Sequence, residues 1–252
     1  MPLCRPSTQE VWDQVRARFD NSLTATDTPT TWNEACFLRE FQQGKNIIDA
    51  AAQIAPRLEI LALSSLSNAM SNSKHTWVWG FDSKAQSVKY LTSKAGEGAD
   101  GTIIFRSIIP SDTDESSIKE TYTESPTCHL PPCVNPPTAT GPFVEALVLR
   151  APPRTTMHGT SGPMQFNKYI KLWSQLQGVK TAVQALTSNE AVSLWPDGFG
   201  IELAKTACYI RESGWDGAKV PFLPEQAGVD LNALTDVASY IKSVDWSSVL
   251  NR

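Results

Sequence analysis

Residues 33–65 read NEACFLREFQQGKNIIDAAAQIAPRLEILALSS, and this stretch decides the fold. Asn33 is a residue type that caps helices, and the apolar residues after it recur at helical spacing as far as Pro56. The apolar run at 58–63 is short and is closed by two serines, which is typical of a buried parallel strand. The stretch therefore predicts a long helix followed by such a strand.

Gly44 interrupts the predicted helix at a position where most residues would favour helix formation more. A glycine inside a helix costs about 1 kcal/mol relative to alanine. We therefore expect Gly44 to permit the close approach of another backbone.

The alternation of helix and strand continues to residue 109. Asp82 is expected to open a second helix, with Ala85 and Val88 facing inward. Residues 102–109, TIIFRSII, form the next predicted strand. Helices that alternate with apolar strands predict an α/β fold with a doubly wound parallel sheet.

The second half of the chain gives weaker patterns. Residues 110–142 hold many of the prolines together with Ser, Thr and acidic residues, which predicts a long irregular loop. Residues 143–149 fit a strand or a helix. We expect the remaining elements to be helices at 166–176, 201–212 and 231–242 and a strand at 179–186.

Composition and charge exclude several classes of protein. The chain has 252 residues, of which 41% are hydrophobic and 19% charged, and its net charge of −4 favours no nucleic-acid partner. No apolar run approaches the roughly 20 residues that a membrane helix needs. The N-terminus also lacks the apolar stretch of a secretory signal. We therefore expect a cytoplasmic protein without a membrane partner.

The five cysteines are odd in number and scattered, which argues against a disulfide scaffold. Residues 128–133, CHLPPC, bring two thiols and one imidazole close together. Because only three potential ligands are present and two prolines stiffen the spacer, we expect a proline-rich loop there and no metal site.

Several short strings follow one another in the order found in a known protein family. They are QGKNIIDAA at 43–51, SSLSNA at 64–69, FDSKA at 81–85, GPFV at 141–144, APP at 151–153, GFG at 198–200 and DWSS at 245–248. With these strings in this order, the chain resembles the NmrA-like proteins, an atypical branch of the short-chain dehydrogenases and reductases. The likeness is to the fungal type that occurs in secondary-metabolite gene clusters.

The resemblance implies a Rossmann-like domain that binds NADP(H), with a smaller C-terminal mixed α/β lobe for the substrate. On this basis we divide the chain into three portions. Residues 1–32 form an N-terminal helix and a linker, and residues 33–109 form an incomplete, partial Rossmann-like portion. Residues 110–252 form the irregular loop and the substrate lobe.

One part of the family's pattern is not found. The family opens with a strand, a Gly-rich turn and a helix that hold the pyrophosphate, whereas residues 1–32 look unrelated to them. GEGADG at 96–101 has the glycine spacing of such a turn, but a predicted helix precedes it and a strand follows it. Its acidic residues would also repel phosphate, so we interpret it as a loop.

Lys84 is the candidate catalytic and cofactor-binding residue. By the resemblance, it is the lysine that binds the nicotinamide ribose; as a residue of a predicted helix, it could instead be a solvated surface lysine. Many members of the family have a proton-donating Tyr or His four residues earlier, on the same helix face. That position is Gly80 here, and a glycine side chain has no proton to donate.

Ser64 and Ser65 stand at the end of a predicted parallel strand, where open α/β sheets bind ligands. Both are candidate substrate-binding residues, and Ser64 is also a candidate cofactor-binding residue, although they could simply end the strand. His75 is a further candidate for binding substrate, or else a surface histidine of its loop. We expect Asp82 to cap its helix and His158 to lie in a turn rich in Gly, Ser and Thr.

Three functions follow from these patterns. The first is an NADP-dependent oxidoreductase that acts on a small organic intermediate of fungal secondary metabolism. The second is a non-redox isomerase or cyclase on the same scaffold, and the third is a non-catalytic regulatory or binding protein. A Rossmann sheet without its first strands exposes an unpaired edge, so a homo-oligomer or a partner chain at that edge is also expected.

Overall fold

The computed structural model describes thirteen parts of the chain, and the fold is given for these alone. They are residues 32–72, 78–95, 101–105, 121–123, 129–130, 134–152, 155–161, 164–182, 184–187, 190, 198–215, 217 and 222–250. The N-terminal helix predicted within residues 1–32, His75, the glycine-rich segment before residue 101 and most of the CHLPPC segment lie outside them.

The first half of the described chain alternates helix and strand as the sequence predicts. Helix α2 (Trp32–Gln53) is followed by the short 3-10 helix η1 (Ala55–Arg57) and by strand β1 (Leu61–Ser65). Helix α4 (Trp79–Ala95) then leads to strand β2 (Gly101–Phe105). The first strand thus starts three residues later than the apolar run and includes both serines, because its pairing with β2 continues to Ser65.

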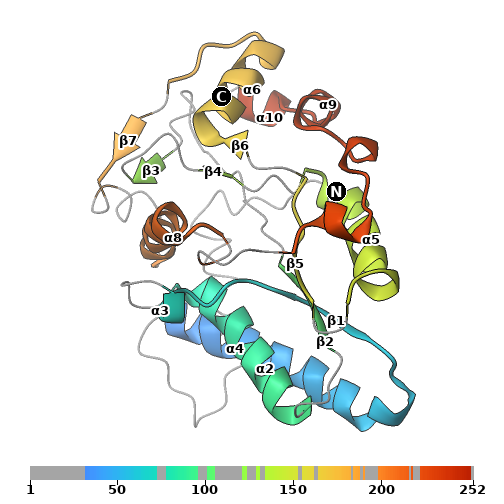
Figure 1. Ribbon diagram of the computed structural model, residues 1–252. Coiled ribbons are helices and arrows are strands. Elements are labelled where there is room, and N and C mark those ends of the chain that lie inside the picture. Colours follow the sequence, from blue (N-terminus) through green and yellow to red (C-terminus); the bar gives the residue numbers. More distant parts are fainter. Residues whose placement is uncertain are drawn as a thin grey trace.

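A three-stranded parallel sheet forms the centre of this part of the molecule. Its order is β1-β2-β5, where β5 is Thr156–His158, and all pairs are parallel. Helix α4 contacts β1 and β2, and helix α5 (Pro136–Leu149) contacts the same two strands from the other side (Figure 1). Because β5 follows residue 109, the sheet continues into the second half of the chain; the division into domains stays a prediction.

Helix α5 corrects the expectation of an irregular loop over 110–142 and decides the ambiguity at 143–149. It begins with Pro136 and Pro137, which occupy the first turn, where backbone N–H groups have no partner inside the helix. Prolines are therefore tolerated at the very place where they suggest a loop in the sequence.

The remaining elements include α8 (Phe199–Ser213), whose start contacts α2 through a hydrogen bond from the Asn33 side chain to the Gly198 carbonyl at 3.0 Å, and most of them are drawn above the sheet in Figure 1. They are β3 (Thr121–Thr123), β4 (His129–Leu130), β6 (Met164–Gln165), α6 (Phe166–Gln177), β7 (Gln184–Leu186), α8 (Phe199–Ser213), η3 (Pro224–Ala227), η4 (Leu231–Ala233), α9 (Val237–Ser243) and α10 (Ser247–Leu250), while the short α3 (Ala69–Asn72) precedes α4. Strand β3 pairs with β7 and β4 with β6, each as a two-stranded sheet. That these elements form a substrate lobe stays a prediction.

Two further expectations are wrong in their bounds. The predicted strand at 179–186 is reduced to β7, and the predicted helix at 231–242 is broken between η4 and α9. The break occurs because the Asp236 side chain accepts a hydrogen bond from the Ser239 N–H at 2.9 Å and so starts a new helix.

Gly44 permits the close approach of another backbone, as the sequence predicts. A Cβ atom on Gly44 would lie 2.1 Å from the Ser87 Oγ and 2.8 Å from the Ser87 Cβ, so helices α2 and α4 touch at this point. One turn further along, the Tyr90 hydroxyl donates a hydrogen bond to Asp49 at 2.7 Å. These two contacts fix α2 against α4.

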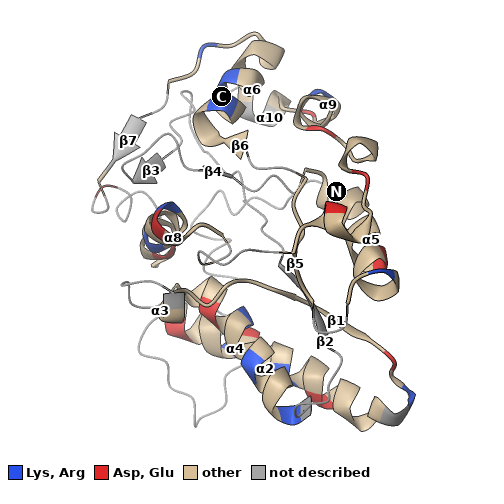
Figure 2. Ribbon diagram, viewed as in Figure 1, with Lys and Arg blue, Asp and Glu red and all other residues tan. Residues whose placement is uncertain are grey.

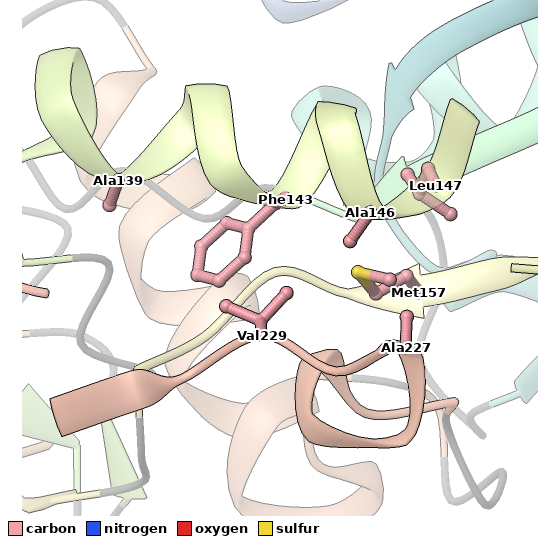
Figure 3. Packing of buried hydrophobic residues seen from close by; sticks show 7 residues of the cluster. All are labelled: Ala139, Phe143, Ala146, Leu147, Met157, Ala227 and Val229. Carbon is pink, nitrogen blue, oxygen red and sulfur yellow. The ribbon is translucent and has the colours of Figure 1, made fainter. Parts of the chain in front are cut away.

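The buried core joins α5 to the strand beside it and to the C-terminal part of the chain. Phe143 and Leu147 of α5 pack with Met157 of β5 and with Ala227 and Val229, and all five are at most 7% exposed (Figure 3). This cluster explains how the chain after residue 222 is held to the sheet.

The charged side chains of the described helices are mixed in sign. Figure 2 shows basic and acidic residues interspersed along α2, α4 and α8. Within the described residues, no helix combines the length and the apolar character of a membrane span.

Candidate functional site

The carboxyl ends of the three parallel strands meet at one edge of the sheet. Ser65 is paired with Phe105, and Phe105 with His158, so these residues end β1, β2 and β5 in register. Ligands of open α/β sheets bind outside this edge. The expectation that His158 lies in a turn is therefore wrong: it ends a strand at the functional edge, and its N–H donates to the Phe222 carbonyl at 2.9 Å.

The two candidate serines point to opposite faces of the sheet because side chains alternate along a strand. Ser65 is fully buried, and its hydroxyl lies 3.4 Å from the Leu66 carbonyl oxygen. Ser64 is exposed. Ser64 is in register, through Ile104, with Met157, which packs on α5. Only Ser64 is therefore open to a ligand.

The start of α4 lies next to the end of β1. The Asp82 carboxylate binds backbone N–H groups there. The helix begins at Trp79, so Asp82 is not its first residue as expected. Its carboxylate nevertheless accepts the N–H of Val78 at 2.9 Å and that of Met70 at 3.0 Å. Asp82 is fully buried, and the resulting desolvation raises the pKa of its carboxyl above 3.8 despite these hydrogen bonds.

Glu202 of α8 is a second carboxyl at the same helix start, and the sequence analysis missed it. Its Oε1 accepts the Gly80 N–H at 2.8 Å, and its Oε2 accepts the Trp79 N–H at 3.2 Å. Burial raises the pKa of the Glu202 carboxyl, and the nearby Asp82 raises it further. No pattern in the sequence could connect residues that are 122 positions apart.

The Lys84 ammonium group is bound by polar groups of its own helix, α4, and of the neighbouring helix, α2. Its Nζ lies 2.5 Å from Oε1 of Glu40 and 3.1 Å from the Gly80 carbonyl oxygen. The other oxygen of Glu40 accepts a hydrogen bond from the buried Ser83 hydroxyl. The Lys84 side chain is 32% exposed, so part of the ammonium group remains accessible. These bonds tie Lys84 to α2 and to Gly80, and they join it to neither candidate serine.

Cys36 of α2 faces the same group of carboxyls. Burial, together with Glu202 and Glu40, raises the pKa of the Cys36 thiol from 9.0 to about 11. A raised pKa favours the protonated thiol over the reactive thiolate at neutral pH. Among the described residues, no group of three or more His, Cys, Asp or Glu side chains could hold a metal ion.

The starts of α4 and α5 are poorly suited to a pyrophosphate. Phosphates bind to free N–H groups at helix starts. At α4, the N–H groups of Val78, Trp79 and Gly80 are taken by carboxylates. At α5, the first two residues are prolines, which have no N–H. The starts of α4 and α5 therefore present few free N–H groups to a diphosphate.

We expect the desolvation of Asp82 to make stability depend on pH. A raised pKa means that the protonated form is favoured by folding, so this contribution is lost as the pH rises from about 3.8 through the folded-state value. The free energy of unfolding of the native chain, minus that of Asp82→Asn, should therefore fall between pH 4 and pH 7. Urea unfolding at several pH values measures this difference, and a rise with pH would show that the two N–H donors outweigh burial.

Comparisons with known proteins show a likeness in fold. No family model matches the sequence, and no curated protein matches it. Among solved structures, a double mutant of NmrA matches with a TM-score of 0.57 at 14% identity, covering 81% of this chain and 69% of that chain. NmrA, described as a negative transcriptional regulator, in complex with NAD matches with a TM-score of 0.56 at 16% identity and the same coverage.

The chain has the NmrA fold. A further crystal form of NmrA agrees, with a TM-score of 0.54 at 14% identity, again over 81% of this chain and 69% of NmrA. The predicted resemblance to NmrA-like proteins is thereby confirmed for the fold. The parallel order β1-β2-β5 follows the order of these strands in the chain, although β3 and β4 lie between β2 and β5 in the sequence.

Proposed function

We propose that this chain is an NmrA-like oxidoreductase that uses a nicotinamide dinucleotide, with NADP as the form that the family resemblance implies. Its substrate would be a small organic intermediate of fungal secondary metabolism. The observation that carries the proposal is the NmrA fold, since one NmrA structure is a complex with NAD. The register that brings the ends of β1, β2 and β5 together supports a ligand at that edge.

Lys84 and Ser64 are the proposed cofactor-binding residues; Ser64 lies on the α5 face of the sheet and Lys84 belongs to α4 on the other face, so they would contact different parts of the ligand. The ammonium group of Lys84 is partly exposed and is a donor for ribose hydroxyls, and the hydroxyl of Ser64 is exposed at the sheet edge. Glu40 holds the Lys84 ammonium group in place. When bound, the cofactor would supply a hydride. The starts of α4 and α5 offer a pyrophosphate few free N–H groups, so the proposal rests on the nicotinamide half.

A second candidate function is a regulatory NmrA-like protein that binds a dinucleotide without turnover. It is favoured by Gly80, which has no side chain to donate a proton, and by the carboxylates that fill the start of α4. NmrA itself is described as a negative transcriptional regulator. The two functions differ in whether bound NADPH reduces a carbonyl compound.

Titration with NADPH tests the proposed function through the quenching of intrinsic tryptophan fluorescence. We expect saturable quenching by NADPH and a dissociation constant about tenfold higher in Lys84→Met, because one hydrogen bond from a charged donor is lost. The matched control is Lys89→Met, which removes an exposed lysine of the same helix and should leave the dissociation constant unchanged. Circular dichroism of each variant shows whether it is folded. An absence of saturable quenching in the native chain would end the proposal.

A further inference from the structure

One flank of helix α2 is in contact with α8 at its beginning. The Asn33 side chain donates a hydrogen bond to the Gly198 carbonyl at 3.0 Å, and Cys36 lies close enough to the Glu202 carboxyl for that group to raise the pKa of its thiol. Ile47 is on the same flank as Cys36, because the 11 residues between the two positions make about three helical turns. The flank therefore continues along α2 beyond the contact with α8.

The rest of this flank is an open face of apolar side chains, made of Ile47, Ala50 and Ile54. Ile47 is 54% exposed and Ile54 is 53% exposed, and Ala50 between them is exposed as well. Gln43, the exposed residue one turn earlier, carries no charge. Single apolar side chains are common on protein surfaces, whereas a continuous row of them marks a place of contact. A segment that covers this open face would extend the packing that α8 begins.

We propose that residues 7–20 of the same chain form a helix that docks on the open face of α2. This segment lies outside the described residues, and its sequence fits the face. Val11, Val15 and Phe19 recur at a spacing of four and so form one apolar stripe on a helix. At about 1.5 Å per helical residue, the stripe is about 12 Å long, and the open face from Ile47 to Ile54 is about 10 Å long.

The chain between the proposed helix and α2 is long enough for this docking. Residues 21–31 connect the two, and 11 extended residues span up to about 36 Å. Ile47 is 15 residues beyond Trp32, the first residue of α2, so it lies about 22 Å from the start of that helix. The segment can therefore fold back along α2 as far as the open face.

The small size of the open face favours a tethered segment over a separate molecule. A stable interface between two proteins buries about 600–800 Å² on each partner, and a row of three side chains about 10 Å long offers only a small part of that area. A segment of the same chain needs less area, because a short linker holds it at an effective concentration in the millimolar range. Residues 7–20 are therefore a better occupant than a second copy of the chain.

Trypsin tests the docking because the proposed helix contains Arg16 and Arg18. A protease cuts a backbone that is locally open, so docking should slow cleavage after these two residues. We expect both bonds to be cut at least about tenfold more slowly in the native chain than in a peptide of residues 1–31, with mass spectrometry identifying the products. Equal rates in the chain and the peptide would overturn the inference.

Variants of α2 show where the segment docks. Ile47→Asp and Ile54→Asp each place a charge on the open face, and each should raise the rate of cleavage after Arg16 to that of the peptide. Gln42→Asp is the matched control, because Gln42 is exposed on the other side of α2, and it should leave the rate unchanged. Circular dichroism shows that each variant is folded. If the isoleucine variants behave like Gln42→Asp, the segment does not dock on this face and the inference fails.

The dependence on protein concentration separates a tethered segment from a second copy. Docking within one chain has the same strength at every concentration. Resistance to trypsin that increases with protein concentration would mean that a second copy covers the open face, and it would overturn the assignment to residues 7–20. Since no cofactor takes part in these measurements, they test the docking separately from the proposed function.

Discussion

Replacing Phe143 with alanine is expected to lower the free energy of unfolding by about 4 kcal/mol, the cost of removing a fully packed aromatic side chain. Phe143 is 2% exposed, and its ring points from α5 toward Val229 (Figure 3). The change would open a cavity between the helix, Met157 of β5 and the chain after residue 222. Urea unfolding followed by tryptophan fluorescence measures the loss.

Leu149→Ala is the matched control for Phe143→Ala. Leu149 is the last residue of the same helix and is 70% exposed, so its truncation should change the free energy of unfolding by less than about 0.5 kcal/mol. Equal losses in the two variants would mean that α5 does not pack on β5 as described.

Gly44→Ala is expected to lower the free energy of unfolding by about 2 kcal/mol, although alanine is the better helix former. Alanine favours the helix by about 1 kcal/mol. The added Cβ would lie 2.8 Å from the Ser87 Cβ, however, so α2 and α4 would have to separate, and overpacking of this kind costs about 3 kcal/mol. Thermal and urea unfolding both report the net effect.

Two further variants isolate the contact at Gly44. Ser87→Gly, combined with Gly44→Ala, removes the clash, so the double variant should be more stable than the sum of the single changes predicts. Gly141→Ala is the control, because a Cβ there would meet no atom within 4 Å. The gain in helix propensity, about 1 kcal/mol, is opposed by the following Pro142, which disfavours helical backbone for a residue with a Cβ, so the net change should be small. A destabilised Gly141→Ala together with a neutral Gly44→Ala would contradict the assigned contacts.

The helices with strong periodicity could be predicted from the sequence. The apolar spacing after Asn33 predicted α2 nearly to its ends, and the helix predicted at 166–176 is α6. Each prediction rests on interactions within one segment, which the order of residues specifies directly. The role of Gly44 could be predicted for the same reason, since a glycine is unfavourable in a helix unless a neighbour needs its space.

The predicted bounds of helices were wrong where a residue type is compatible with two local structures. Pro136 and Pro137 favour a loop in the sequence but also suit the first turn of α5, and only packing against β5 decides between them. Asp82 was expected to be the first residue of α4. It lies one turn inside the helix instead, where its carboxylate accepts hydrogen bonds from the N–H groups of Val78 and Met70.

By itself, the sequence determined the α/β class, the long helix before β1 and the likeness to NmrA, because these depend on periodicity and on short strings of residues. Only the tertiary structure decided the candidate site. It placed Glu202 beside Gly80, Glu40 against Lys84 and His158 in register with Ser65. These residues are far apart in the chain, and their proximity is set by how helices and strands pack, which no local pattern specifies.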